Sequence, residues 1–180
     1  MSNFKGTYKI YGEYMKKIGV ISDTHGKIPE EGFMKFLGSC DEIWHAGDIG
    51  DNKVIENLEL VKPVKAVYGN IDGPEIRFKW PEYQEFTCES MDVLITHIGG
   101  RPGKYNYSAK HLLKNRPVDI FVCGHSHMLR IQYDKSGNFL FINPGAAGTS
   151  GFHKKRTAVR FQIEGKNIKD MEIYELEHKT

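Results

Sequence analysis

The chain has 180 residues, 39% of them hydrophobic and 27% charged, which is ordinary for one soluble globular domain. The formal net charge is only +2, so no strong overall field indicates a nucleic acid or another polyanion as a partner. No segment approaches the roughly 20 apolar residues of a membrane-spanning helix, and the polar start of the chain lacks the apolar core of a signal peptide. Three cysteines without a CxxC pair suit free thiols in a reducing compartment, so we expect a cytoplasmic protein without a membrane partner.

The first half of the chain alternates between predicted strands and predicted helices. Short apolar runs predict buried strands over 18–21, 43–46 and 64–68. Helical spacing of apolar residues predicts helices over 29–37 and 54–61 between them. This alternation predicts a parallel sheet, whose strand ends commonly hold ligands.

The second half predicts mainly strands and turns. In chain order we expect a hairpin over 83–96, a loop over 99–104, a helix over 106–115, a strand over 120–123, and hairpins over 129–142 and 157–176.

Polar residues with metal-ligand chemistry follow the predicted strands at their ends. In order they are Asp23 and His25, Asp48, Asn70, His97, and then His125 and His127. Oxygen and nitrogen ligands without a thiolate suit Mn, Fe, Zn or Ni. Seven ligands are too many for one ion, but they fit two ions bridged by one carboxylate, the arrangement used for phosphoryl displacement.

The order of these motifs resembles that of the calcineurin-like metallophosphoesterases, in particular the small single-domain phosphodiesterases of bacteria and archaea. The motifs are Asp23-Thr24-His25, Gly47-Asp48, Gly69-Asn70, His97 and Gly124-His125-Ser126-His127. The resemblance runs from Lys17 to the C-terminus. It implies an α/β fold, a four-layer α/β/β/α sandwich of mixed sheets flanked by helices, with the metals at the sheet edge.

The resemblance also implies a role for each ligand. Asp23, His25 and His127 would hold one divalent ion. Asn70, His97 and His125 would hold the other, and Asp48 would bridge the two. Mn²⁺ is the expected ion, with Fe, Ni or Zn as alternatives.

A hydroxide on these metals would attack the phosphorus of a small phosphoester substrate. Asp48, Asn70 and His97 would act through that hydroxide, and Asn70 would also contact the substrate. We expect a phosphodiesterase. A phosphomonoesterase of the same family is one alternative, and a non-catalytic scaffold resembling the retromer subunit is another, although retention of all seven ligands argues against the scaffold.

Other residues have two interpretations each. Larger relatives have a proton-donating His after Gly-Asn, where this chain has Ile71. His45 is a candidate donor or else a buried histidine with satisfied hydrogen bonds. Arg101 and Lys104 are candidate substrate contacts or else ordinary surface charges.

Two further segments carry an expectation. The turn 143–146 resembles the family's glycine-bearing turn near the site, or it simply closes a hairpin. The basic run 153–156 is expected to be a solvated turn.

Residues 1–16 are interpreted as an N-terminal extension, and residues 17–180 as the metallophosphoesterase domain. Because small relatives begin at about this point, Met15 is an alternative to Met1 as the start of the protein. A homo-oligomer is an open alternative.

Overall fold

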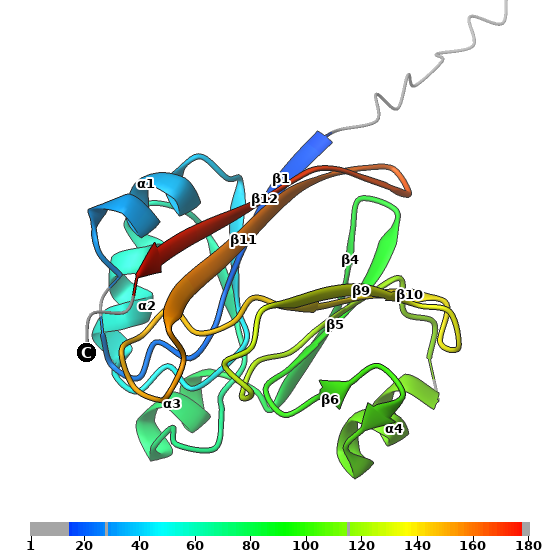
Figure 1. Ribbon diagram of the computed structural model, residues 1–180, viewed down its shortest axis with the longest axis horizontal. Coiled ribbons are helices and arrows are strands. Elements are labelled where there is room, and N and C mark those ends of the chain that lie inside the picture. Colours follow the sequence, from blue (N-terminus) through cyan, green and yellow to red (C-terminus); the bar gives the residue numbers. More distant parts are fainter. Residues whose placement is uncertain (1–14, 28, 115, 178–180) are drawn as a thin grey trace, which may run out of the picture.

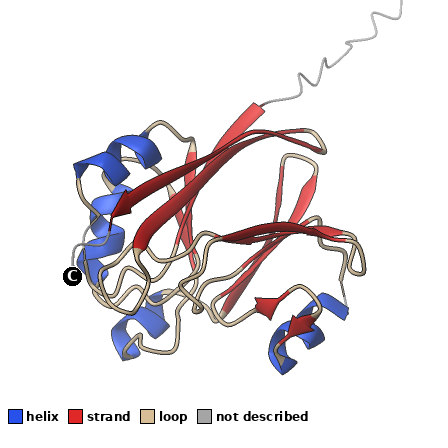
Figure 2. Ribbon diagram, in the orientation of Figure 1, coloured by secondary structure: helices blue, strands red, loops and turns tan. Residues whose placement is uncertain are grey.

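The computed structural model describes residues 15–27, 29–114 and 116–177, and it arranges them around two facing β-sheets (Figures 1 and 2). Most of the predicted N-terminal extension therefore lies outside the described residues. None of the helices in the described ranges is long and apolar enough to cross a membrane.

The first sheet has five strands in the order β12-β11-β1-β2-β3. Strands β1, β2 and β3 run parallel, as the alternating pattern predicts, while β11 runs antiparallel to β1 and β12. The bounds are β1 (Met15–Ile21), β2 (Glu42–His45), β3 (Val64–Ala66), β11 (Lys155–Glu164) and β12 (Asn167–Glu177).

The second sheet has five strands in the order β4-β5-β8-β10-β9. Its centre is parallel, because β5, β8 and β10 share one direction, and both of its edges are antiparallel hairpin partners. The bounds are β4 (Tyr83–Cys88), β5 (Met91–Thr96), β8 (Ile120–Val122), β9 (Arg130–Asp134) and β10 (Phe139–Asn143).

Three of the helices form the outer layers. Helices α1 (Glu31–Gly38) and α2 (Asn52–Glu59) cover the first sheet, and α4 (Tyr107–Lys114) covers the second (Figure 1). The sequence did not predict α3 (Pro74–Lys79), although its proline in the first turn is a helix-start signal. The loop predicted over 99–104 is instead a small hairpin of β6 (Gly100–Arg101) and β7 (Lys104–Tyr105).

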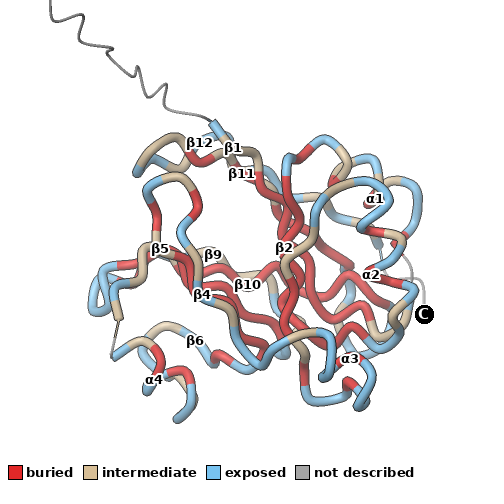
Figure 3. The backbone as a smooth tube through the Cα atoms, turned by 180° about the vertical axis from the view of Figure 1, so that it is seen from behind, coloured by how far each residue is buried: buried red, intermediate tan, exposed pale blue. Residues whose placement is uncertain are grey.

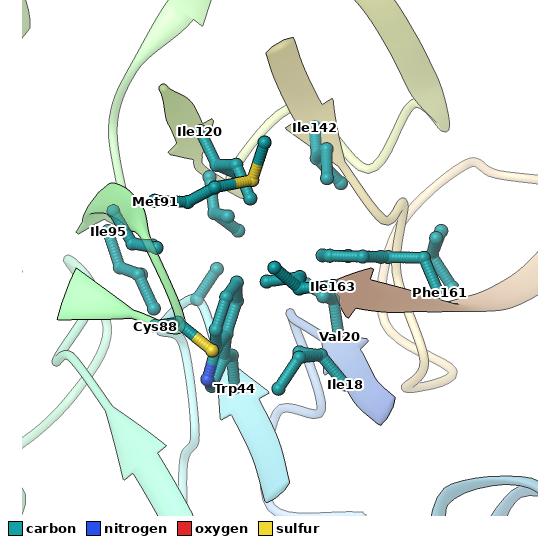
Figure 4. Packing of buried hydrophobic residues seen from close by; sticks show 14 of the residues in the cluster. Ile18, Val20, Trp44, Cys88, Met91, Ile95, Ile120, Ile142, Phe161 and Ile163 are labelled. Atoms are coloured by element: carbon teal, nitrogen blue, oxygen red, sulfur yellow. The ribbon is translucent and has the colours of Figure 1, made fainter. Parts of the chain in front are cut away.

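Three buried clusters hold these layers together. Between the sheets, Ile18, Val20 and Trp44 of the first face Ile95, Ile120 and Ile142 of the second (Figure 4). A second cluster lies under α1 and α2, and a third joins α4 to the outer face of the second sheet. Buried positions accordingly follow the strands (Figure 3). This arrangement confirms the predicted four-layer α/β/β/α sandwich.

Candidate metal centre

The structure brings the predicted acidic and histidine ligands together in two groups. Asp23, His25 and His127 form one group, and Asp48, His97 and His125 form the other. Within each group the ligand atoms lie within 4.8 Å of one another. Ligand bonds of about 2.0–2.2 Å allow three such atoms to close on one ion.

Asp48 lies between the two groups and offers one oxygen to each. Its Oδ1 is 3.2 Å from His97 Nε2, and its Oδ2 is 3.8 Å from His25 Nε2. On the far side of the first group, Asp23 Oδ1 is 3.2 Å from His127 Nε2. Each Asp48 oxygen therefore faces a histidine of a different ligand group.

His97 provides an independent test of whether these residues fit a cation. Its Nδ1 lies 2.8 Å from the carbonyl oxygen of Ala46, which can only accept, so the proton of the neutral ring is on Nδ1. The buried Nε2 then presents a lone pair toward Asp48 Oδ1, and it has no hydrogen-bond partner within the described residues. Two acceptors facing each other in a buried site are what a metal ion stabilises.

The pKa shifts show the same preference for positive charge. Burial alone would lower the pKa of His97, but the Asp48 and Asp23 carboxylates outweigh it and raise that pKa. Contact with Asp23 raises the pKa of His127 as well. Burial would raise the pKa of Asp48, yet His97 and the Ile71 N–H hold it below its ordinary value. A site with this negative potential also favours bound cations.

Most of the ligands sit on left-handed backbone. The positive φ angles are 54° at Asp23, 49° at His25, 53° at Asp48, 68° at His125 and 55° at His127. Asp and His tolerate this region better than most residues, but each such residue still costs about 1–2 kcal/mol. Strain of this kind concentrates at functional sites, where the surrounding structure maintains it.

Backbone hydrogen bonds join the ligand loops to one another. Asp23 N–H donates to the Gly47 carbonyl at 3.0 Å, and His25 N–H donates to the Asp48 carbonyl at 3.0 Å. The His125 N–H donates to the Asp23 carboxylate at 3.1 Å. The ends of β1, β2 and β8 are thereby held at one edge of the two sheets.

Close approach explains two glycines in the motifs. A Cβ at Gly69 would lie 2.1 Å from Asp48 Oδ1, and a Cβ at Gly124 would lie 2.0 Å from Ser22 Oγ. Neither distance is tolerable, so only glycine lets these loops approach the ligands.

Asn70, the seventh predicted ligand, follows Gly69 in the loop after β3 and is exposed. The loop reaches the centre through Ile71, whose N–H donates to Asp48 Oδ1 at 3.1 Å. Arg77 of α3 fixes the same loop, because its Nη2 donates to the Asn70 carbonyl at 3.1 Å. Asn70 and His97 line one hollow of about 220 Å³.

Asp72 is a site residue that sequence reasoning did not assign. Its buried carboxylate accepts from the backbone N–H groups of Ile49, Gly50 and Gly69 at 3.1, 2.7 and 2.7 Å. These three bonds clamp the loop that carries Asp48 to the loop that carries Asn70. The position of an acid two residues after Asn70 was the only sequence signal.

His45 does not have the environment of a proton donor. It is fully buried, and its Nδ1 accepts from the Gly47 N–H at 3.2 Å, which leaves the proton of the neutral ring on Nε2. That Nε2 lies 3.0 Å from Thr24 Oγ1, and burial lowers the pKa of His45 to about 4. The structure therefore fits the alternative interpretation, a satisfied buried histidine, and not the candidate donor.

The turn 143–146 contacts the ligand loop directly. The Asn143 side-chain amide donates to the Gly124 carbonyl at 2.8 Å and to Ser126 Oγ at 3.1 Å. The turn thus holds the segment that carries His125 and His127, which is more than closing a hairpin.

The basic run 153–156 is only partly the solvated turn that the sequence predicted, since Lys154 and Lys155 are exposed. Arg156 is buried and pairs with Glu30 at 2.5 Å. His153 Nε2 lies 3.1 Å from the Gly148 carbonyl, and its Nδ1 lies 3.3 Å from Nδ1 of His127. Since the carbonyl only accepts, His153 is protonated on Nε2 and accepts from His127 through Nδ1. This contact directs the lone pair on His127 Nε2 toward the first ligand group.

Replacing His153 by Ala is expected to weaken Mn²⁺ binding by about 10–100-fold, the usual effect of losing such a supporting contact. His153→Asn keeps an acceptor near the position of Nδ1 and should restore most of the affinity. Titration of the metal-free protein with Mn²⁺ measures both effects, with His111→Ala on α4 as a control. Equal loss in the Ala and Asn variants would show that the hydrogen bond to His127 is not the cause.

Comparison with known proteins agrees with this geometry. Residues 15–166 match the model of the calcineurin-like phosphoesterase superfamily domain. A probable metallophosphoesterase from Methanothermobacter thermautotrophicus is 31% identical over 134 residues, covering 72% of this chain and 76% of that protein. A phosphodiesterase from Methanocaldococcus jannaschii is 27% identical over 146 residues, covering 72% and 82%.

A solved structure of Vps29 from Entamoeba histolytica, complexed with zinc, has a TM-score of 0.68 at 16% identity and covers 91% of this chain and 99% of its own. At that identity it shows the fold alone. The family match shows more: the chain belongs to the calcineurin-like phosphoesterase superfamily, which confirms the resemblance drawn from its motifs.

Proposed function

We propose that this protein hydrolyses phosphodiesters at a centre of two divalent cations, with Mn²⁺ as the ion. Asp23, His25 and His127 hold one cation in this proposal. Asn70, His97 and His125 hold the other, and Asp48 bridges them.

The position of Asp48 carries the proposal. Its two oxygens face different histidines, His97 at 3.2 Å and His25 at 3.8 Å, so a single ion would leave one of these contacts unexplained. His97 Nε2 has no hydrogen-bond partner among the residues that the structure describes, and most ligands have left-handed backbone. Both features support a metal site over a scaffold, which has no need for either.

The chain's own residues have clear tasks in this reaction. The histidines would bind the cations through neutral ring nitrogens. For two of them the structure gives a partner to the other ring nitrogen: the Ala46 carbonyl for His97, and His153 for His127. Asp72 and Asn143 keep the ligand loops in place. When bound, two divalent ions generate the nucleophile from water at neutral pH and offset charge on the phosphoryl oxygens. Water's oxygen then bonds to phosphorus as the ester P–O bond breaks.

Space on two sides of the ligands favours a diester substrate. Asn70 and His97 line the hollow of about 220 Å³, while His125 and His127 line another of about 400 Å³. A phosphodiester has two substituents to accommodate, whereas a monoester has one.

Three free and buried cysteines also suit the reducing cytoplasm that we propose as the location.

The test is metal removal and reconstitution. After treatment with a chelator, the protein should lose hydrolysis of bis(p-nitrophenyl) phosphate, and added Mn²⁺ should restore it as two equivalents bind. We expect p-nitrophenyl phosphate, the matched monoester, to react at least about tenfold more slowly. Neither ligand group contains a cationic side chain that would offset the additional negative charge of a monoester. Full activity in protein that elemental analysis shows to be metal-free would overturn the proposal.

A further inference from the structure

A pocket of about 510 Å³ adjoins the metal ligands at the β6–β7 hairpin and the start of β9. Ser126, which separates His125 from His127 in the chain, forms part of its wall. The pocket shares Asn106 with the hollow of about 220 Å³ and Ser126 with the hollow of about 400 Å³. The pocket therefore adjoins both hollows beside the ligands.

The charged side chains of the pocket are all cationic. They are Arg101 on β6, Lys104 on β7 and Arg130 on β9, and no acidic residue of the described part of the chain lines the pocket. Within ranges 15–27, 29–114 and 116–177, none of the three forms an ion pair, and Arg130 Nη1 donates only to Gln132 at 3.2 Å. Three cations without acidic partners attract an anionic group, and two of them are guanidinium groups, which suit phosphate.

The pocket also contains fixed aromatic residues. The ring centroids of Tyr105 and Phe141 are 6.2 Å apart, and both residues line the pocket. The Tyr105 hydroxyl donates to the buried carboxylate of Asp134, which keeps that acid engaged and the tyrosine ring in place. Phe141 is fully buried, so the partly exposed Tyr105 ring is the aromatic surface on which a flat ring can stack.

We propose that this pocket is a subsite for a nucleotide that carries a second phosphate beyond the scissile one. Tyr105 would contact the base, and Arg101, Lys104 and Arg130 would bind the second phosphate. Its volume falls within the roughly 300–1,000 Å³ of small-molecule sites. The inference rests on the proposed function and narrows its substrate class to small phosphodiesters of nucleotides.

The test compares two substrates that differ only in the second phosphate. They are the p-nitrophenyl ester of thymidine 5′-phosphate and the same ester with a 3′-phosphate. In the Mn²⁺-loaded protein, the 3′-phosphate should raise kcat/KM by about tenfold or more, mainly through KM, since hydrogen bonds to charged groups have effects of this size. A ratio near one in the unmodified protein would overturn the subsite.

Variants locate the effect. Arg130→Gln should bring the ratio of the two kcat/KM values close to one, and Arg130→Lys should retain part of it. Lys135→Gln, in the turn of the same β9–β10 hairpin and outside the pocket, should leave the ratio unchanged. An unchanged ratio in Arg130→Gln would contradict the assignment.

A binding measurement separates failure of the subsite from failure of the proposed function. By calorimetry, thymidine 3′,5′-bisphosphate should bind the unmodified protein several-fold more tightly than 1,3-propanediol bisphosphate, and Arg130→Gln should weaken its binding. Equal affinity for the two bisphosphates would overturn the nucleotide assignment. If no ester is hydrolysed although two Mn²⁺ ions are bound, the proposed function fails, and the binding result still decides the subsite.

Discussion

Asp48→Asn is expected to abolish Mn²⁺ binding in both ligand groups and to lower phosphodiester hydrolysis by about a thousandfold or more. Asn has one neutral oxygen where Asp48 has two charged ones, and those two oxygens face His97 at 3.2 Å and His25 at 3.8 Å. The amide nitrogen, a donor, would face one of these histidines in place of a ligand atom. Elemental analysis after dialysis gives the metal content, and bis(p-nitrophenyl) phosphate gives the rate.

Asn at this position is nearly isosteric and can still accept the Ile71 N–H, so the loop should keep its fold. Asp119→Asn is the matched control, because that carboxylate accepts a backbone N–H from Asp92 at 2.9 Å far from the ligands. It should retain both ions and the full rate. Two tightly bound ions in Asp48→Asn would show that this carboxylate does not bridge.

Much of the fold was predictable because the longer strands show alternating or continuous apolar runs in their sequence. The predicted hairpin over 83–96 appears as β4 and β5, since alternating and apolar runs there end at clear turn residues. Helix α3 and the β6–β7 hairpin were missed because six residues and two residues are too few to display a period. Their packing partners are distant in sequence: Ile76 of α3 joins the cluster under α1 and α2, and Tyr105 of β7 packs against Phe121.

The candidate ligands were predictable for a different reason. They follow strand ends, and in a parallel arrangement these ends meet at one edge of the sheet. The supporting residues give no such signal. His153 contacts His127 across 26 positions, and Arg130 reaches the pocket only because β9 lies at the edge of the second sheet. Such pairings are set by tertiary structure.

The rate of hydrolysis is expected to depend steeply on the pKa of the leaving group. Ile71 stands where larger relatives have a proton-donating histidine, and its side chain has no proton to donate. The loop position is close to the reaction, because Ile71 N–H donates to Asp48 Oδ1 at 3.1 Å and the side chain is 47% exposed. Aryl phosphodiesters, whose phenolate leaves unaided, should react well, and alkyl esters should react about 10²–10⁴-fold more slowly than a general acid would allow.

Ile71→His should make this dependence shallower, because the introduced imidazole can protonate a poor leaving group. Rates over a series of aryl and alkyl phosphodiesters, plotted against leaving-group pKa, give the slope for each variant. Ile71→Phe is the matched control, since it introduces a ring of similar size without an acidic proton. Its slope should equal that of the unmodified protein.

A shallow slope in the unmodified protein would mean that another group already supplies the proton. His45→Gln then decides whether His45 does so, since loss of a donor would steepen the slope. We expect no such change, because His45 is fully buried, both its ring nitrogens have partners, and burial lowers its pKa to about 4. If neither Ile71→His nor His45→Gln alters the slope, the proton comes from water, and the identity of residue 71 has no bearing on the chemistry.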